Sequence, residues 1–198
     1  MINKIILASS STRRKEILGR LGLDFTVISP DADENCDESM APWEYVCELS
    51  KRKCDAVMKN TAVADDALVI ACDTVVVYGG RIIGKPESPL HAHVTLRLLS
   101  DSYHDVYSGL TLSCGGKTVT QSARTTVKMR AVSEADTEKY VASGEPMGKA
   151  GSYAIQGLGS ALVEKIDGDF YNVMGFPVPL FCDMLEREYG LSVFSLMK

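Results

Sequence analysis

The chain begins with a strand that leads directly into a helix. Residues 5–7 form a short apolar run that is typical of a buried strand. Ile17, Leu18 and Leu21 follow at the spacing of one face of a helix. Between them lie Ser11, a residue type favoured at a helix N-cap, and two arginines. The strand therefore leads into the helix through hydroxyl and guanidinium groups.

This turn has the chemistry to hold an anion. The first N–H groups of a helix lack intrahelical partners, and the helix dipole is positive at that end. Arg13 and Arg14 add two guanidinium groups that suit phosphate oxygens. The alternative is a capped surface helix, with Ser11 as its N-cap and both arginines in water. This segment alone leaves both interpretations open.

Composition limits the classes of protein to consider. The 198 residues are 45% apolar, enough for one compact domain or two intimate lobes. A net charge of −5 without a long basic run argues against non-specific binding to nucleic acid or to a membrane surface. The sequence contains neither a secretory leader nor a long apolar span, so we expect a cytoplasmic protein without a membrane segment.

Cysteine and histidine spacing argues against a zinc site. The six cysteines are scattered without a C-x-x-C pair, so we expect reduced thiols. The three histidines lack zinc-ligand spacing with any cysteine.

An acidic stretch at residues 31–35 follows a strand predicted over residues 25–28. It is either a solvated loop or a source of carboxylates for a metal ion.

A long helix is predicted to begin near Pro42, a residue type that suits the first helical turn. Lys51 and Lys53 flank its apolar stripe at about 80° on either side. Either lysine could border a pocket, or both could extend from the rim of the core into water. Spacing alone does not choose between them. The stripe itself comprises Trp43, Val46, Cys47, Ser50, Cys54, Val57 and Met58.

Residues 68–86 predict a β-hairpin that turns at Gly79-Gly80. Asp73 interrupts its otherwise apolar first strand. A carboxylate at such a position must be paired, bound to a cation or connected to solvent in a cleft, because burying it alone is too costly.

Counting residue pairs from the two-residue turn places Thr74 opposite Lys85 and Asp73 opposite Pro86. Lys85 would then lie near Asp73 but on the other face, unless a bulge or a longer turn brings both to one side. The alternative is a single ion pair at the end of the hairpin.

The rest of the chain alternates between helices and strands. Residues 147–159 are too rich in glycine for a regular element, and their glycines would let the backbone approach a ligand closely. Gly116-Lys117-Thr118 is not a phosphate-binding loop, because Thr111 stands where that motif needs glycine and the flanking segments are strands. We expect helices at 88–100, 133–143 and 179–189, a hairpin at 110–129 and a strand at 161–166.

Six segments match one family in order and over nearly the whole chain. They are Leu7-Ala8-Ser9 with Arg13-Arg14, Asp73-Thr74, Gly84-Lys85-Pro86, Ala142 to Pro146, Lys149 to Gly157 and Asn172 to Pro177. Together they resemble the Maf family of nucleoside triphosphate pyrophosphatases. Two positions depart from the family's pattern: Thr12 replaces the usual proline, and Gly84 replaces the usual residue before Lys-Pro.

The resemblance implies a mixed α/β fold with a twisted sheet flanked by helices. It further implies two lobes with a central cleft, similar to inosine triphosphate pyrophosphatase, and a single Maf-like domain over residues 1–198. A homodimer is expected from the resemblance alone.

The resemblance also implies the site residues. It selects Lys53 rather than Lys51 on the long helix. Glu34 and Asp73 would hold Mg²⁺ or Mn²⁺, although Asp33 could replace Glu34, and whether Asp73 acts as base or metal ligand stays open. The implied substrate-binding residues are Ser9, Arg13, Arg14, Thr74 and Gln156, and the implied catalytic residues are Glu34, Lys53, Asp73 and Lys85.

The implied reaction is cleavage of dTTP, UTP or modified pyrimidine nucleotides to the monophosphate and pyrophosphate. The Gln156 amide can pair with N3–H and O4 of uracil or thymine. A glutamate at this position resembles the family branch that acts on 7-methyl-GTP. The alternatives are a 7-methyl-GTP pyrophosphatase, a phosphatase that releases orthophosphate, and a nucleotide-sensing regulator of cell division.

Overall fold

The computed structural model describes residues 2–37 and 39–197. Within these ranges, seven strands form a sheet in the order β2-β1-β3-β5-β6-β7, with β4 paired to β3. β1 pairs in parallel with β2 and β3, whereas the β3–β4 and β6–β7 pairs are antiparallel. The mixed α/β fold class is therefore confirmed. The strands are β1 (Lys4–Ala8), β2 (Thr26–Ile28), β3 (Ala67–Tyr78), β4 (Arg81–Ile83), β5 (Tyr103–Cys114), β6 (Lys117–Met129) and β7 (Val163–Asp167).

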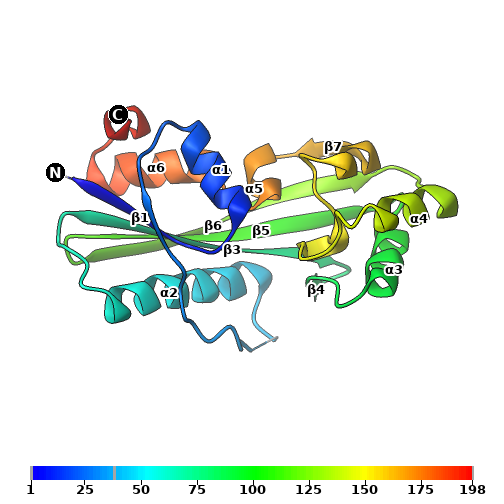
Figure 1. Ribbon diagram of the computed structural model, residues 1–198, viewed down its shortest axis with the longest axis horizontal. Helices are drawn as coiled ribbons and strands as arrows, with labels where there is room; N and C mark the ends of the chain where they lie inside the picture. The colour runs from blue at the N-terminus through cyan, green and yellow to red at the C-terminus, as the bar shows by residue number, and fades with distance from the viewer. Residues whose placement is uncertain (1, 38, 198) are drawn as a thin grey trace. The chain divides into compact units, whose positions relative to one another are not determined.

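Helices accompany the sheet (Figure 1). None of the described helices is both long enough and apolar enough to cross a membrane. They are α1 (Thr12–Arg20), α2 (Pro42–Asn60), α3 (Pro89–Leu99), α4 (Glu134–Ala142), α5 (Phe170–Met174) and α6 (Val178–Tyr189), with 3₁₀ turns η1 (Ala150–Ser152), η2 (Leu158–Leu162) and η3 (Val193–Leu196).

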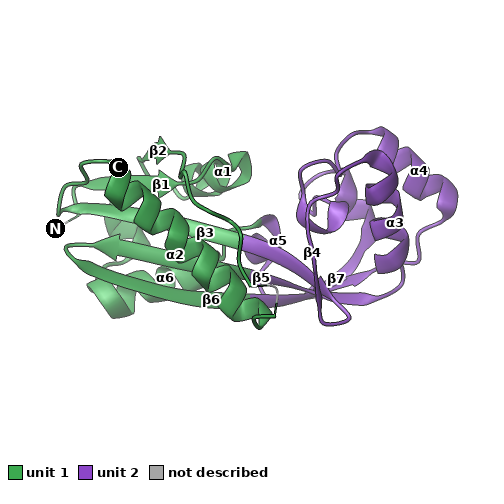
Figure 2. Cartoon of the chain, turned by 90° about the horizontal axis from the view of Figure 1, so that it is seen from below, with its two compact units in different colours: residues 1–73, 108–123, 175–198 green, residues 74–107, 124–174 purple. Residues whose placement is uncertain are grey.

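The chain divides into two compact units (Figure 2). Unit 1 comprises residues 1–73, 108–123 and 175–198, and unit 2 comprises residues 74–107 and 124–174. A single domain over residues 1–198 and a cleft between two lobes stay predictions.

In unit 1, α2 covers one face of the sheet, and α1 and α6 cover the other (Figure 1). Because both faces are covered, residues 5–8 and 67–73 are buried at every position instead of at alternate ones. On the α2 side the core comprises Ile6, Ala8, Cys54, Val57, Ala67, Val69 and Ala71.

The predicted helix boundaries are confirmed where the sequence carries capping residues. The side chains of Ser11, Ser88 and Ser133 each accept a hydrogen bond from the backbone N–H three residues later. α2 begins with Pro42, and α6 ends at Gly190, whose φ of 66° is left-handed.

The predicted stripe of α2 is wrong at two positions. Trp43 and Met58 are exposed by 51% and 39%, whereas Lys53 is buried. The buried stripe runs through Val46, Ser50, Lys53 and Val57 at intervals of three or four residues. Met58 lies at the edge of this stripe, and Trp43 lies in the first helical turn.

The first predicted hairpin ends sooner than expected. Tyr78 pairs with Arg81 as predicted, but the last pair is Val76 with Ile83, so the pairs that placed Lys85 and Pro86 opposite β3 are wrong. Proline has no N–H to donate to a ladder, and the Gly84 carbonyl instead accepts a hydrogen bond from Gly151 N–H.

Unit 2 holds α3 and α4, which pack against each other, and α3 also packs against η1. The apolar residues that predicted α3 do not all face this contact: Leu90, Val94 and Leu98 are exposed, whereas Leu99 is buried. The spacing identified the helix but not the face that is buried.

The end of unit 2 departs from the prediction at two places. The strand expected at 161–166 is β7, Val163–Asp167, because η2 occupies the residues before it. The sequence analysis did not predict the short helix α5.

Candidate active site

The parallel pairing of β1 and β3 brings several predicted site residues of unit 1 to one edge of the sheet. Ala8 at the end of β1 pairs with Ala71 on β3. Ser9 directly follows Ala8, and Asp73 lies two residues after Ala71. α1 begins at Thr12, so its first turn lies beyond the same end of β1. The carboxyl ends of parallel strands are a common place for ligand sites in α/β folds.

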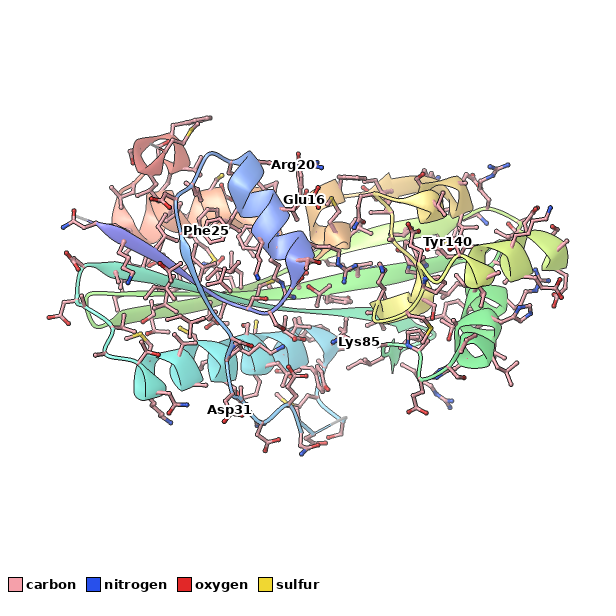
Figure 3. All side chains as sticks on the ribbon, in the orientation of Figure 1. Glu16, Arg20, Phe25, Asp31, Lys85 and Tyr140 are labelled. Carbon is pink, nitrogen blue, oxygen red and sulfur yellow. The ribbon has the colours of Figure 1, made fainter. Side chains whose placement is uncertain are left out.

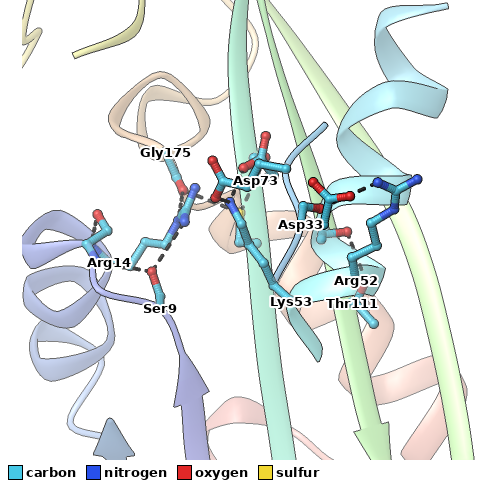
Figure 4. Close-up of polar contacts among 12 residues, drawn as sticks. Ser9, Arg14, Asp33, Arg52, Lys53, Asp73, Thr111 and Gly175 are labelled. Carbon is cyan, nitrogen blue, oxygen red and sulfur yellow. Dashed lines mark hydrogen bonds and ion pairs between the residues drawn. The ribbon is translucent and has the colours of Figure 1, made fainter. Parts of the chain in front are cut away.

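Lys53 lies between two carboxylates, of which Figure 4 labels Asp73. Its Nζ is 2.5 Å from Asp73 Oδ1 and 2.8 Å from Glu34 Oε1. Burial alone would lower the pKa of Lys53, but Asp73 and Glu34 outweigh burial, and the pKa is raised. Lys53 is therefore a protonated ammonium at neutral pH.

Asp73 is a buried carboxylate with a partner, as the sequence requires. Its side chain is 12% exposed and accepts a hydrogen bond from Lys53. Breaking such a buried pair leaves an uncompensated charge, which costs about 3 to 5 kcal/mol. Its partner Lys53 belongs to α2, the helix for which spacing left Lys51 and Lys53 as alternatives.

The structure distinguishes the two lysines of α2. Lys53 is 8% exposed and lies inside the buried stripe. Lys51 is exposed and forms an ion pair with Asp55 one turn along the same helix. The placement agrees with the residue that the family resemblance selected.

The acidic stretch at residues 31–35 is a loop, and Glu34 is its member that contacts Lys53. Asp33 points elsewhere, because its Oδ1 accepts a hydrogen bond from Asn35 N–H. Arg52 donates to the carbonyls of Asp33 and Asn35 and so holds the loop against α2 (Figure 4).

Arg14 is fixed by groups that follow two separate elements. Its Nε donates to the Gly175 carbonyl at 2.9 Å, and its Nη1 donates to Ser9 Oγ at 3.3 Å. Ser9 is buried, and its Oγ also accepts a hydrogen bond from Ser11 N–H. The Cys72 thiol lies 3.4 Å from the same Gly175 carbonyl.

Arg13 has no partner of this kind. Its side chain is half-buried, and among the described residues no carboxylate or hydrogen-bond acceptor contacts its guanidinium. Burial, followed by the adjacent charge of Arg14, lowers its pKa. A half-buried cation beside another cation is unfavourable unless an anion joins them. Ser11 caps α1 as the second interpretation expected, and anion binding by the turn stays a prediction.

Three predicted site residues belong to unit 2. Thr74 directly follows Asp73 on β3 and is half-buried. Lys85 is exposed in the loop after β4 (Figure 3). Gln156 is exposed between η1 and η2.

Gln156 does not serve to satisfy the backbone of its own loop. Over the described part of the chain, its side-chain amide makes no hydrogen bond. Instead, the backbone N–H groups of Leu158 and Gly159 donate hydrogen bonds to the Glu145 carboxylate. The amide of Gln156 therefore keeps both its donor and its acceptor available to a ligand.

The sequence analysis missed two groups that position these residues. The Gly175 carbonyl is the partner of Arg14, and Glu145 holds the Gln156 loop. Both lie in segments that carried the family resemblance, which was the only signal in the sequence.

The residues that could hold a metal ion are the two carboxylates that contact Lys53. Residues 2–37 and 39–197 contain no group of three or more His, Cys, Asp or Glu side chains placed to hold a metal ion. Glu34 and Asp73 do converge on a single cation, the Lys53 ammonium. Mg²⁺ is commonly held by one or two carboxylates together with substrate phosphates and water. The carboxylate pair fits that chemistry.

Comparison with known proteins gives consistent matches over most of the chain. A family model described as "Maf-like protein" matches residues 4–188. A protein of Dictyoglomus thermophilum named dTTP/UTP pyrophosphatase is 45% identical, over 94% of this chain and 97% of its own length. The protein of the same name from Dictyoglomus turgidum is 44% identical, over 98% and 100%.

Two further matches are more limited in coverage or identity. The Clostridium novyi protein named dTTP/UTP pyrophosphatase is 43% identical, over 88% of this chain and 92% of its own length. The solved structure of the Staphylococcus aureus Ham1 protein aligns with a TM-score of 0.44 and 16% identity, over 64% of this chain and 72% of that chain.

Proposed function

We propose, because the chain belongs to the Maf-like protein family, that it hydrolyses dTTP and UTP to the nucleoside monophosphate and pyrophosphate. The observation that carries the proposal is the ion cluster of unit 1, in which Lys53 lies between Glu34 and Asp73. The turn with Ser9, Arg13 and Arg14 lies at the same edge of the sheet. Cations beside paired carboxylates are the groups that hydrolysis of a phosphoanhydride requires.

The first part of the proposal is that the β1–α1 turn binds phosphate. Arg14 is held by Ser9 and Gly175, so its guanidinium is already oriented. Arg13 brings a second positive charge to the same turn. A triphosphate would bring negative charge to these two guanidinium groups.

The second part concerns the attacking water. Asp73 is placed to accept a proton from water or to hold a metal ion, and Lys53 to stabilise negative charge that develops on the phosphates. The pyrophosphate leaves with the electrons of the broken bond between the α-phosphorus and the bridging oxygen. The oxygen of water becomes part of the monophosphate.

Glu34 and Asp73 would hold a Mg²⁺ or Mn²⁺ ion. When bound, the ion supplies Lewis-acid polarisation of a phosphate oxygen. The Lys53 ammonium, which lies between these carboxylates, remains available to contact the phosphates.

In unit 2, we assign base selection to Gln156 and Thr74, and phosphate binding to Lys85. The Gln156 amide is exposed and presents one donor and one acceptor, which complement O4 and N3–H of uracil or thymine. Lys85 is an exposed cation in the loop after β4. The homodimer and the cytoplasmic location belong to the same proposal, and light scattering of the purified protein tests the first of these.

A panel of triphosphates tests the proposal. Purified protein is incubated with Mg²⁺ and dTTP, UTP, CTP, ATP, GTP or 7-methyl-GTP, and the products are separated by anion-exchange chromatography. We expect monophosphate and pyrophosphate in equal amounts, fastest from dTTP and UTP. Diphosphate with orthophosphate would identify a phosphatase, and fastest turnover of 7-methyl-GTP would identify the other family branch. Tight binding without turnover would favour a regulatory role.

A further inference from the structure

Gln156 lies in a tight turn whose two ends are both held by α4 and the residues after it. The N–H of Gly157 donates to the Ala154 carbonyl, which makes residues 154–157 a β-turn. Ile155 is buried and Gln156 is exposed, so the turn anchors one side chain in the core and presents the next. We call residues 154–159 the Gln156 loop.

Glu145 holds the C-terminal end of the Gln156 loop. Its Oε1 accepts a hydrogen bond from Leu158 N–H at 3.0 Å, and its Oε2 accepts one from Gly159 N–H at 2.8 Å. Burial would raise the pKa of Glu145, but the hydrogen bonds from Tyr140, Gly159 and Leu158 outweigh burial, and the pKa is lowered. Glu145 is therefore a carboxylate at neutral pH.

Tyr140 connects Glu145 to the other end of the Gln156 loop. Its hydroxyl donates to Glu145 Oε2 at 2.8 Å and accepts a hydrogen bond from Ala154 N–H at 3.1 Å. Tyr140 is buried and extends from α4, where Figure 3 labels it. A single hydroxyl thus ties the start of the turn to the carboxylate that holds its end.

The glycines of the Gln156 loop make room for Glu145 and Tyr140. A Cβ atom at Gly157 would lie 2.0 Å from Glu145 Oε1, and one at Gly159 would lie 2.7 Å from the Tyr140 hydroxyl. The sequence suggested that these glycines allow close approach of a ligand. At Gly157 the close neighbour is Glu145, and at Gly159 the close neighbours are the Tyr140 hydroxyl and the Ala154 backbone.

We propose that Glu145 and Tyr140 are positioning residues for base selection, which hold the backbone of the Gln156 loop so that the Gln156 side chain meets the edge of the base at one fixed place. This inference rests on the proposed function, because it assumes that Gln156 reads the base. It extends the proposal by naming the groups that make a single exposed amide selective. On an unrestrained loop the amide could shift along the edge of the base and pair with either uracil or cytosine, since it carries both a donor and an acceptor.

Binding of UTP and CTP provides the test, because the two differ only on the edge of the base. Dissociation constants are measured by calorimetry for the wild type, Glu145→Gln and Tyr140→Phe, without metal so that turnover does not interfere. We expect the preference for UTP to fall about tenfold in Glu145→Gln, since a hydrogen bond to a charged group contributes about a factor of ten or more. Tyr140→Phe should reduce the preference less, because Glu145 keeps both backbone contacts.

The matched control is Glu138→Gln, the same chemical change at an exposed position of α4. Its preference for UTP over CTP should equal that of the wild type. If Glu145→Gln weakens binding of both nucleotides equally and leaves the preference unchanged, the carboxylate has only a structural role and the inference is overturned. If Glu145→Gln does not fold, the result for Tyr140→Phe decides in the same way.

A double-mutant cycle tests whether Glu145 acts through Gln156. Gln156→Ala should remove the preference, and adding Glu145→Gln should then change the ratio of the two dissociation constants by less than twofold. A further loss of preference in the double variant equal to that of Glu145→Gln alone would contradict the inference. Release of pyrophosphate from UTP is measured separately, so a wild type that binds selectively without turnover would refute the proposed function and not this positioning role.

Discussion

The ammonium of Lys53 lies 2.5 Å from the carboxylate of Asp73, and both side chains are almost entirely buried in unit 1. Glu34, on an exposed loop, contacts the same ammonium at 2.8 Å. One carboxylate of this cluster is therefore held in the sheet and the other on the surface.

Replacement of Lys53 tests whether the buried ammonium contributes to turnover. Lys53→Met should lower kcat/KM for UTP about 100-fold or more, because removing one preorganised donor to developing charge typically has an effect of this size. Lys51→Met is the control, since Lys51 is exposed and paired only with Asp55. Steady-state kinetics with circular dichroism of both variants checks the result, and a larger loss in Lys51→Met would show that the wrong lysine was assigned.

Gln156→Glu tests the base-reading role. A carboxylate offers only acceptors, so it leaves O4 of uracil without a donor. An unpaired buried polar group costs about 1 to 3 kcal/mol, so kcat/KM for UTP should fall roughly 5- to 150-fold, with a shift toward guanine substrates. Equal values for UTP in the wild type and the variant would exclude Gln156 as the reader of the base.

His104 should make the folded chain sensitive to acid. Burial lowers the pKa of His104 from 6.5 to about 4, although Asp105 acts in the opposite direction. Its Nε2 lies 2.8 Å from the Tyr153 hydroxyl, and over the described residues its buried Nδ1 has no hydrogen-bond partner. The neutral ring is therefore the form compatible with folding.

The sign of this effect follows from proton uptake on unfolding. Between pH 6.5 and about 4 the unfolded chain binds a proton that folded His104 does not. This part of the stability is present above pH 6.5 and is lost as the pH falls toward 4, by about 3 kcal/mol over the whole window at about 1.4 kcal/mol per pKa unit. Urea unfolding at several pH values should show this loss in the wild type and in His91→Gln, an exposed histidine, but a smaller one in His104→Gln. Equal dependence of the unfolding free energy on pH in the two variants would contradict the assignment of this effect to His104.

Gly109 should tolerate no side chain. A Cβ atom there would lie 2.1 Å from the Val46 carbonyl of α2, which is a backbone atom and cannot move without shifting the helix. Gly109→Ala should destabilise the fold by about 1 to 3 kcal/mol or more in urea unfolding. Gly19→Ala in α1 is the control, because nothing lies within 4 Å of its new Cβ, and it should stabilise by about 0.5 to 1 kcal/mol. A Gly109→Ala variant that is as stable as Gly19→Ala would show that α2 and β5 are not in close contact.

Local signals in the sequence predicted most of the helices. Ser11, Ser88 and Ser133 cap helices in the structure because a capping hydroxyl acts on an N–H only three residues away. Strand ends were less accurate: the pairs assigned to Lys85 assumed a ladder longer than the one that forms. Where β4 ends depends on the contact of Gly84 with Gly151, which lies far along the chain.

Only site residues that were marked by an unusual charge or by the family resemblance could be predicted from the sequence. Asp73 stood out because a carboxylate in an apolar strand needs a partner, but helical spacing could not choose Lys53 over Lys51. The choice depends on how α2 is rotated against the sheet, which is a tertiary property. Glu145 was missed because two of its three partners are backbone N–H groups, those of Leu158 and Gly159, and backbone groups leave no signature in a sequence.

The central claim is that the cluster around Asp73 carries out the reaction. Asp73→Asn keeps the shape of the side chain and removes the charge that a metal ion or a proton requires. Pyrophosphate release from UTP with Mg²⁺ should fall by about 10² to 10⁴, the usual effect of losing a positioned acid or base, while circular dichroism shows a folded chain. A folded Asp73→Asn variant that retains more than about a tenth of wild-type turnover would contradict the account, given that range.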